Sequence, residues 1–398
     1  MPDLIQHCPS AAELDDLELL LVGALVPRHG FDGPGGELTL DLPPAVAEAA
    51  ARDGLELVDP EGLPLARLAP DGGLSALSRP EFGPFRRLYL TPAQAREQHA
   101  GRRVVPVTDA PGDEQVAALA ADGRPVLLLA LVGTGTPDLS APALLRACLA
   151  VAAQLPDAAV VAVPLAAHPA APGLDVELRA AVLAAYAGDD EVVELGAPTE
   201  VSGEVARIVL GDRPDRSHQG LVLLFSGLSG SGKSTLARAL MDRVLETGAR
   251  TVTSLDGDVV RRHLSAGLGF SREDRKTNIR RIGWVAAEIG RHGGLAVCSP
   301  IAPYAETRAQ VRAMAEDAGA AFVLVHVATP LEECERRDRK GLYAKARRGE
   351  IPDFTGISSP YEEPTDAEVR VDTTGRTIAD AVDDVWSALV RAGYLEEA

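Results

Sequence analysis

A glycine-rich segment carries the clearest chemical signal in this sequence. Residues 227–234 read Gly-Leu-Ser-Gly-Ser-Gly-Lys-Ser and satisfy the pattern GxxxxGK[ST]. In this pattern the glycines let backbone N–H groups converge on nucleotide phosphates, the lysine reaches the β and γ phosphates, and the last hydroxyl can bind Mg²⁺. The sequence therefore predicts an ATP site with Lys233 as a catalytic residue and Ser234 as a metal ligand. Its members are Gly227, Ser229, Gly230, Ser231, Gly232, Lys233, Ser234 and Thr235.

The elements around this segment decide whether it can bind phosphate. An apolar run at 221–225 predicts a strand before it, and residues 234–247 predict a helix after it. A phosphate-binding loop needs this strand-to-helix context, because the helix N-terminus adds a favourable dipole. The alternative is a glycine-rich turn that binds nothing.

A pair of carboxylates follows the next predicted strand, at 251–255. Asp256 and Asp258 are separated by one glycine, and the carboxyl ends of parallel strands meet at one edge of a sheet. We predict that both are catalytic and that Asp258 is a Mg²⁺ ligand or the base for an attacking hydroxyl. The alternative is an Asp-Gly turn with solvated charges. No Asn-Lys-x-Asp guanine signature follows, which disfavours a GTPase.

Further apolar runs at 295–299 and 321–327 alternate with helical stretches. This alternation predicts an α/β domain over 211–398, in which helices cover a parallel sheet. Its first residues, 211–220, are polar and are interpreted as a linker.

From residue 221 to the end, the chain resembles adenylylsulfate kinase. The motifs that carry the resemblance are Gly-Leu-Ser-Gly-Ser-Gly-Lys-Ser-Thr235, Asp256-Gly-Asp, Gly269-Phe-Ser, Asp274-Arg-Lys, Asn278-Ile-Arg-Arg281, Lys340-Gly-Leu-Tyr343, Phe354-Thr-Gly-Ile357 and Ser359-Pro-Tyr-Glu362. The resemblance implies transfer of phosphate from ATP to the 3′-hydroxyl of adenylyl sulfate, with Mg²⁺ as cofactor.

The resemblance also implies the residues that bind each nucleotide. Arg337 would contact the adenine of ATP, and residues 340–354 would form a lid that excludes water, with Phe354 stacking on adenine. The residues implied for adenylyl sulfate are Arg261, Phe270, Arg275, Asn278, Ile301, Lys340, Leu342, Lys345 and Phe354. Guanidinium groups, an amide and an aromatic ring suit a phosphosulfate joined to adenosine. The alternatives are a solvated helix face around Arg275 and a solvated basic loop for the lid.

One segment departs from the family pattern. Where many members read Ser-Pro-Tyr-Arg, this chain reads Ala302-Pro-Tyr-Ala305. Without a hydroxyl at 302 no phosphoserine can form, so direct in-line transfer is expected. The missing arginine weakens one anion contact, which Arg308 is expected to replace in part.

The front half predicts two further domains. Residues 1–100 contain short strand candidates, at 37–42 and 55–59, and form a β-rich module. Residues 101–210 alternate strand candidates at 104–107, 126–132, 158–164 and 191–195 with helices at 113–121, 141–153 and 176–187, which predicts a short α/β domain.

This order resembles proteins in which ATP sulfurylase is fused to adenylylsulfate kinase, with a PUA-like module first and a shortened sulfurylase-like domain second. That family holds ATP phosphates with an Asn-Pro-x-His-x-x-His stretch. Here residues 108–115 contain no histidine and are acidic, and such charges repel polyphosphate. His168 is interpreted as a surface histidine. We therefore predict that the front half is catalytically inactive.

Composition limits the partners. The 398 residues carry a formal charge of -19, which disfavours nucleic acids and membrane surfaces. No apolar run is long enough to span a bilayer, and the four cysteines lack metal-site spacing. We expect a cytoplasmic homodimer that binds ATP and adenylyl sulfate. The alternatives are a bifunctional sulfate adenylyltransferase/adenylylsulfate kinase and a nucleotide-binding regulatory pseudokinase.

Overall fold

The computed structural model describes residues 4–33, 36–80, 82–197, 199–338 and 340–396. The chain divides into two compact units, Met1–Arg213 and Pro214–Ala398. The boundary lies within the stretch interpreted as a linker. The front unit contains both a β-rich part and a parallel sheet, and its division into two domains at residue 100 stays a prediction.

The β-rich part of the front unit is a sheet with strand order β1-β2-β3-β4. Its strands are β1 (Gln6–His7), β2 (Leu55–Val58), β3 (Pro64–Leu68) and β4 (Leu74–Ala76), accompanied by helices α1 (Ala11–Leu21) and α2 (Pro44–Asp53). The strand predicted at 37–42 is absent from these described residues. The N–H groups of Glu37 and Leu38 donate instead to the carboxylate of Asp32, which takes the place of a neighbouring strand.

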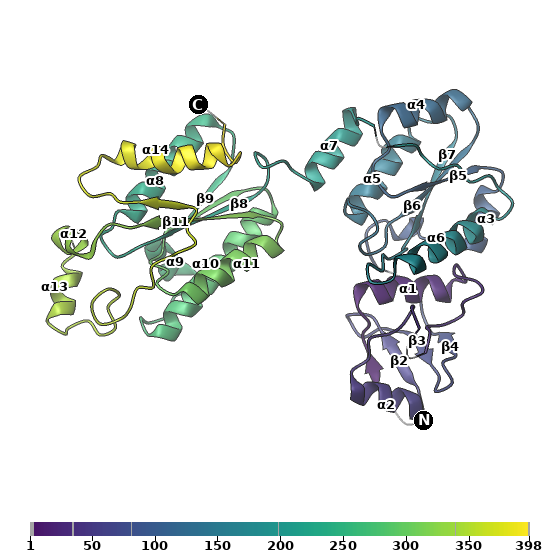
Figure 1. Ribbon diagram of the computed structural model, residues 1–398, viewed down its shortest axis with the longest axis horizontal. Coiled ribbons are helices and arrows are strands. Elements are labelled where there is room, and N and C mark those ends of the chain that lie inside the picture. The colour runs from purple at the N-terminus through teal and green to yellow at the C-terminus, as the bar shows by residue number, and fades with distance from the viewer. Residues whose placement is uncertain (1–3, 34–35, 81, 198, 339, 397–398) are drawn as a thin grey trace. The chain divides into compact units, whose positions relative to one another are not determined.

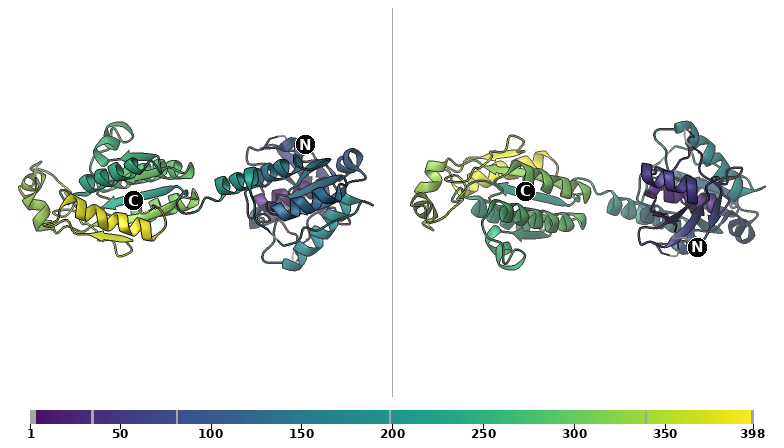
Figure 2. Two further views of the ribbon diagram at one scale, coloured as in Figure 1. Left: turned by 90° about the horizontal axis from the view of Figure 1, so that it is seen from above. Right: turned by 90° about the horizontal axis from the view of Figure 1, so that it is seen from below.

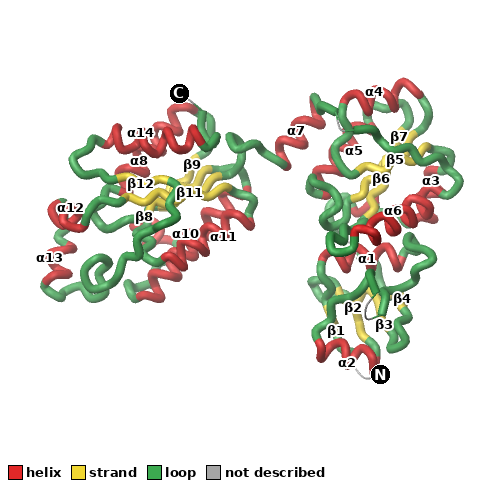
Figure 3. Tube along the Cα trace, in the orientation of Figure 1, coloured by secondary structure: helices red, strands yellow, loops and turns green. Residues whose placement is uncertain are grey.

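The second part of the front unit is a three-stranded parallel sheet with order β5-β6-β7. It consists of β5 (Arg103–Val107), β6 (Val126–Leu131) and β7 (Ala158–Val163), with helices α3 (Pro92–His99), α4 (Asp113–Asp122), α5 (Ala141–Ala152), α6 (Pro172–Ala187) and α7 (Gly203–Asp212) (Figure 3). The fourth predicted strand, 191–195, is reduced to a single bridge between Val104 and Val192. Beyond it, the Gln115 side chain binds the carbonyls of Gly196 and Ala197.

The second unit is a five-stranded parallel sheet with order β12-β11-β8-β10-β9. The strands are β8 (Leu221–Ser226), β9 (Val252–Leu255), β10 (Leu295–Cys298), β11 (Ala321–Val327) and β12 (Val369–Val371). The helices are α8 (Lys233–Thr247), α9 (Gly257–His263), α10 (Arg272–Arg291), α11 (Ala305–Asp317), α12 (Leu331–Arg336), α13 (Leu342–Arg347) and α14 (Ile378–Arg391). This arrangement confirms the predicted helix-covered parallel sheet.

Alternation along β8 explains the layers of this unit. Leu221, Leu223 and Phe225 pack with α8 and α14 on one face, whereas Val222 and Leu224 pack with α10 and α11 on the other (Figures 1 and 2). Side chains of a strand point alternately to the two faces, so a central strand covered on both faces must be apolar throughout. The carboxyl end of β8 is thereby held firmly where the glycine-rich loop begins.

Candidate active site

The glycine-rich loop connects β8 to the first turn of α8. Gly227, Gly230 and Gly232 have φ values of 157°, 75° and 98°. A Cβ on Gly227 would lie 2.5 Å from the carbonyl oxygen of Val327, and one on Gly230 would lie 3.0 Å from that of Cys334. The loop can therefore follow this path only with glycine at these positions. Ser234 and Thr235 are exposed in the first helical turn.

Threonines from distant parts of the chain hold the middle of the loop. The hydroxyls of Thr329 and Thr373 each donate to the carbonyl oxygen of Ser231, at 3.0 Å. Arg337 in turn donates to the Thr373 hydroxyl at 2.7 Å and to its carbonyl at 3.0 Å. Sequence reasoning missed both threonines, since they lie 98 and 142 positions from Ser231 and belong to no local pattern.

Lys233 is buried, and its ammonium donates to the carbonyl oxygen of Leu228 at 2.7 Å. Burial lowers the pKa of Lys233 to about 8, although the nearby charges of Asp256 and Asp258 partly offset this effect. Because β8 and β9 belong to one parallel sheet, the loop that carries Lys233 and the turn that carries both carboxylates lie at the same edge. A cation held at this position is suited to bind phosphate oxygens once they replace the Leu228 carbonyl.

The two carboxylates sit where β9 passes into α9, and they have different surroundings. Asp256 caps α9 by accepting from the N–H of Asp258 at 3.0 Å, and it accepts from the Ser299 hydroxyl at 3.1 Å. Burial raises the pKa of Asp256, but hydrogen bonds led by that from the Ser234 side chain outweigh it and lower the pKa below its usual value. Asp258 is exposed and pairs with Lys340 at 2.8 Å.

Four of the residues predicted for the acceptor nucleotide, Arg261, Phe270, Arg275 and Asn278, lie on α9, on α10 or between these helices. The Arg261 guanidinium lies 4.4 Å from the centroid of the Phe270 ring, and 63% of Phe270 is exposed. Arg275 donates to the Phe270 carbonyl at 2.8 Å and also binds Thr355. Asn278 is buried, and among the described residues its Oδ1 has no hydrogen-bond partner. Together these side chains offer two guanidinium groups, an aromatic ring and an amide oxygen without a partner among the described residues.

The predicted lid contacts the glycine-rich loop through α13. The Tyr343 hydroxyl donates to the carbonyl oxygen of Ser229 at 2.8 Å. Phe354 is buried, with its ring edge-on to Tyr343 at 5.0 Å, so in this state it packs within the lid and is not free to stack on a base. Leu342 packs in the same cluster and Lys345 is exposed. Tyr343 is a further contact that sequence reasoning did not assign.

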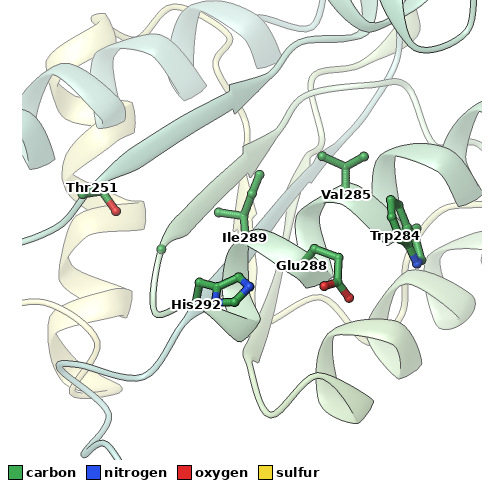
Figure 4. Close-up of a pocket in the computed structure, with 7 residues that line it drawn as sticks. Thr251, Trp284, Val285, Glu288, Ile289 and His292 are labelled. Atoms are coloured by element: carbon green, nitrogen blue, oxygen red, sulfur yellow. The ribbon is translucent and has the colours of Figure 1, made fainter. Parts of the chain in front are cut away.

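A cavity of about 410 Å³ lies beside the loop and is lined by Leu228, Gly356, Ile357, Ser358, Ser359, Pro360, Tyr361 and Glu363. A second cavity of about 440 Å³ is lined by Thr251, Trp284, Val285, Glu288, Ile289, His292 and Gly294 (Figure 4). None of the predicted site residues lines the second cavity. Arg261 and Asn278 line neither of these two cavities.

In the front unit, His168 and Gln115 form contacts within the fold. His168 is not a surface histidine, because its ring binds Asp16 at 3.0 Å and Asp175 at 2.8 Å, with only 16% of the side chain exposed. The Gln115 side chain, in the stretch without histidines, accepts from the N–H of Gly112 at 2.9 Å. No helix in the described part of the chain is long and apolar enough to cross a membrane.

A parallel sheet with a phosphate-binding loop after its central strand, a buried lysine and paired carboxylates at the same edge defines a P-loop kinase. Residues 219–372 match the family model for adenylylsulphate kinase. The second unit of this chain is therefore an adenylylsulfate kinase domain, as the sequence motifs predict.

Similar proteins cover the chain to different extents. The sulfate adenylyltransferases of Neosartorya fischeri and Coccidioides immitis are each 47% identical, over 193 and 195 residues, covering 48% and 49% of this chain. The chain spans only about a third, 34%, of their length. A solved structure, the hexameric adenylylsulfate kinase of Thiobacillus denitrificans, is 29% identical with a TM-score of 0.76, covering 99% of this chain and 95% of that one.

The lowered pKa of Lys233 predicts that ATP binding is linked to proton uptake. Polyphosphate beside the ammonium favours its charged form, so above about pH 8 binding should take up a proton and weaken as the pH rises further. In the free protein the folded pKa lies below the usual lysine value of 10.5. The unfolded chain therefore binds more protons between these values, and the free energy of unfolding rises with pH there.

Calorimetry of ATP binding at about pH 8.5, in two buffers of different ionisation enthalpy, measures this uptake. Lys233→Met should abolish it. An uptake of the same size in this variant would assign the proton to another group.

Proposed function

We propose that the second unit transfers the γ-phosphoryl group of ATP to the 3′-hydroxyl of adenylyl sulfate, giving 3′-phosphoadenylyl sulfate and ADP. The observation that carries this proposal is that buried Lys233 follows β8 and the two carboxylates follow β9, within one parallel sheet. This arrangement brings a cation that can bind phosphate and two carboxylates to one edge of the sheet. The group around Arg261 and Phe270 supports the choice of acceptor.

The residues divide into three roles. Lys233 and the loop N–H groups bind and orient the ATP phosphates, and the lysine compensates charge that develops during transfer. Asp258 binds Mg²⁺ or accepts the proton of the attacking hydroxyl, and in either role its carboxylate must first be released by Lys340. Arg261, Arg275 and Asn278 bind the acceptor, whose phosphosulfate suits two guanidinium groups. With alanine at 302, no protein hydroxyl at that position can form a phosphoserine intermediate.

The oxygen donors near the loop fit a magnesium ion. Mg²⁺ prefers hard oxygen ligands, and it is commonly bound through one or two carboxylates together with substrate phosphates. To the predicted ligands Ser234 and Asp258 we add Asp256, because its carboxylate lies at the same edge of the sheet as the phosphate loop, where β9 passes into α9. When bound, the ion supplies charge neutralisation at the β and γ phosphates.

Lid closure is proposed to keep water from the γ-phosphate. The contact between Tyr343 and Ser229 supports it, because it joins α13 directly to the phosphate loop. Excluding water suppresses wasteful hydrolysis of ATP and strengthens the electrostatic contacts of the site. Arg337 is proposed to contact the adenine of ATP. At present its guanidinium is held by Glu333 and Thr373.

The test is transfer of radiolabelled phosphate from ATP, measured with adenylyl sulfate and with a panel of nucleosides on the full chain. We expect transfer to adenylyl sulfate at a rate at least about 100-fold above that to any nucleoside, because only the former offers anions to Arg261 and Arg275. Equal transfer to a nucleoside would contradict the substrate assignment. Nucleotide binding without transfer would favour the regulatory pseudokinase.

The bifunctional alternative draws on the names of the two fungal relatives. We propose that the front unit lacks that activity, because residues 108–115 contain no histidine and His168 is held by two carboxylates. Incubation with adenylyl sulfate and pyrophosphate should therefore produce no ATP. A homodimer stays a prediction, and sedimentation would distinguish it from a hexamer like that of the T. denitrificans protein.

A further inference from the structure

An unusual turn lies between β10 and α11, beside the start of the phosphate loop. Ala302 has a φ of 47° and is completely buried. Non-glycine residues rarely adopt positive φ, and they do so at a cost that the surrounding structure must compensate. The preceding residue is Ile301, which the family resemblance assigns to the acceptor nucleotide. A strained backbone therefore adjoins a proposed substrate contact.

Three groups fix the two carbonyls of this turn. The carbonyl oxygen of Ile301 accepts from the Ser226 hydroxyl at 2.9 Å and from the N–H of Gly227 at 3.3 Å. The carbonyl oxygen of Ala302 accepts from the Arg308 guanidinium at 2.9 Å and from the Ser226 hydroxyl at 3.2 Å. Because Ser226 ends β8 and Gly227 begins the phosphate loop, these bonds join the acceptor side of the site to the ATP side.

Burial of the Arg308 guanidinium is energetically unfavourable, and the side chain has few hydrogen-bond partners among the described residues. Only 3% of it is exposed, and its Nε has no hydrogen-bond partner among the described residues. No ion pair of Arg308 occurs within the described ranges. A buried guanidinium without a carboxylate is destabilising on its own, so its burial calls for a compensating role. The anion contact predicted for Arg308 is separate from this role and stays a prediction.

We propose that Arg308 is a positioning residue, which holds the turn at residues 301–302 against the start of the phosphate loop and so sets Ile301 where the acceptor nucleotide binds. The inference rests on the proposed function and deepens it. It assigns to Arg308 a role that acts through the backbone of Ala302 and involves no contact with substrate.

The test compares Arg308→Met with Arg312→Met in the full chain. Arg312 lies one turn further along α11 and pairs with Glu368 at 2.7 Å, away from the turn. We expect R308M to raise the KM for adenylyl sulfate by about 10- to 100-fold, the size of effect that a small misplacement produces. Its KM for ATP should change by less than about twofold, and R312M should change neither value.

A second substitution tests the mechanism. Glycine adopts positive φ without strain, so Ala302→Gly should restore most of the lost affinity in the R308M background. Equal increases in both KM values, a lower melting temperature with unchanged KM, or no rescue by A302G would each overturn the proposal. If R308M does not fold, Ser226→Ala removes a donor from the same carbonyls and must give the same selective rise.

Hydrogen exchange separates this proposal from the proposed function, because it needs no turnover. The backbone amides of Ala302, Tyr304 and Ala305 should exchange faster in R308M than in R312M, whichever acceptor the enzyme uses. Equal exchange in the two variants would overturn the positioning role. If the wild-type protein does not phosphorylate adenylyl sulfate but exchange is faster in R308M, only the proposed acceptor is contradicted.

Discussion

Lys233→Met is expected to lower kcat/KM for phosphoryl transfer by at least about 1000-fold. The lysine is the buried cation of the phosphate loop, and no other lysine or arginine belongs to that loop. Methionine has a similar length and is apolar, so it keeps the packing while removing the charge. Because burial already disfavours the ammonium and lowers its pKa to about 8, we expect the melting temperature to stay the same or to rise.

Loss of activity without loss of stability is the distinguishing result. Lys276→Met is the matched control, since Lys276 lies on α10 and pairs with Glu306 at 2.8 Å. It should retain activity within about twofold. Substantial transfer by K233M would contradict the assignment of the phosphate loop, and a large fall in melting temperature would leave the activity loss attributable to unfolding.

Asp256→Asn and Asp258→Asn are each expected to lower kcat/KM by about 100-fold or more and to raise the Mg²⁺ concentration needed for half-maximal rate. Asparagine keeps the shape and one acceptor oxygen of each side chain. The amide introduced by D256N could therefore still cap α9, and the remaining loss would report the missing negative charge.

Magnesium titrations at saturating ATP distinguish the roles of the two carboxylates. A D256N variant that loses activity without any change in Mg²⁺ dependence would restrict Asp256 to capping. Full activity in D258N would remove this carboxylate from the reaction. Asp383→Asn serves as the control, because Asp383 is exposed on α14 and pairs only with Arg243 among the described residues.

Much of the second unit was predictable from local pattern. The strand expected at 321–327 is β11 residue for residue, and the helix expected at 234–247 differs from α8 by one residue. These segments are long, apolar or periodic, so their local preference and their tertiary environment agree. In the front unit the segment at 37–42 has the alternation of a strand, but Asp32 binds its first two amides. The hydrophobic periodicity of the sequence does not show that a side chain such as Asp32 will bind these amides in place of a neighbouring strand.

The sequence by itself determined the phosphate loop, the two carboxylates after the next strand and the kinase family of the second unit. All of these depend on residues only a few positions apart, so the glycines and the spacing of charged residues in the sequence are enough to identify them. Only the tertiary structure decided that Thr329 and Thr373 hold Ser231, that Tyr343 contacts the loop and that Arg308 is buried against Ala302. Such contacts join distant segments, and they depend on strand order and packing, which no local pattern encodes.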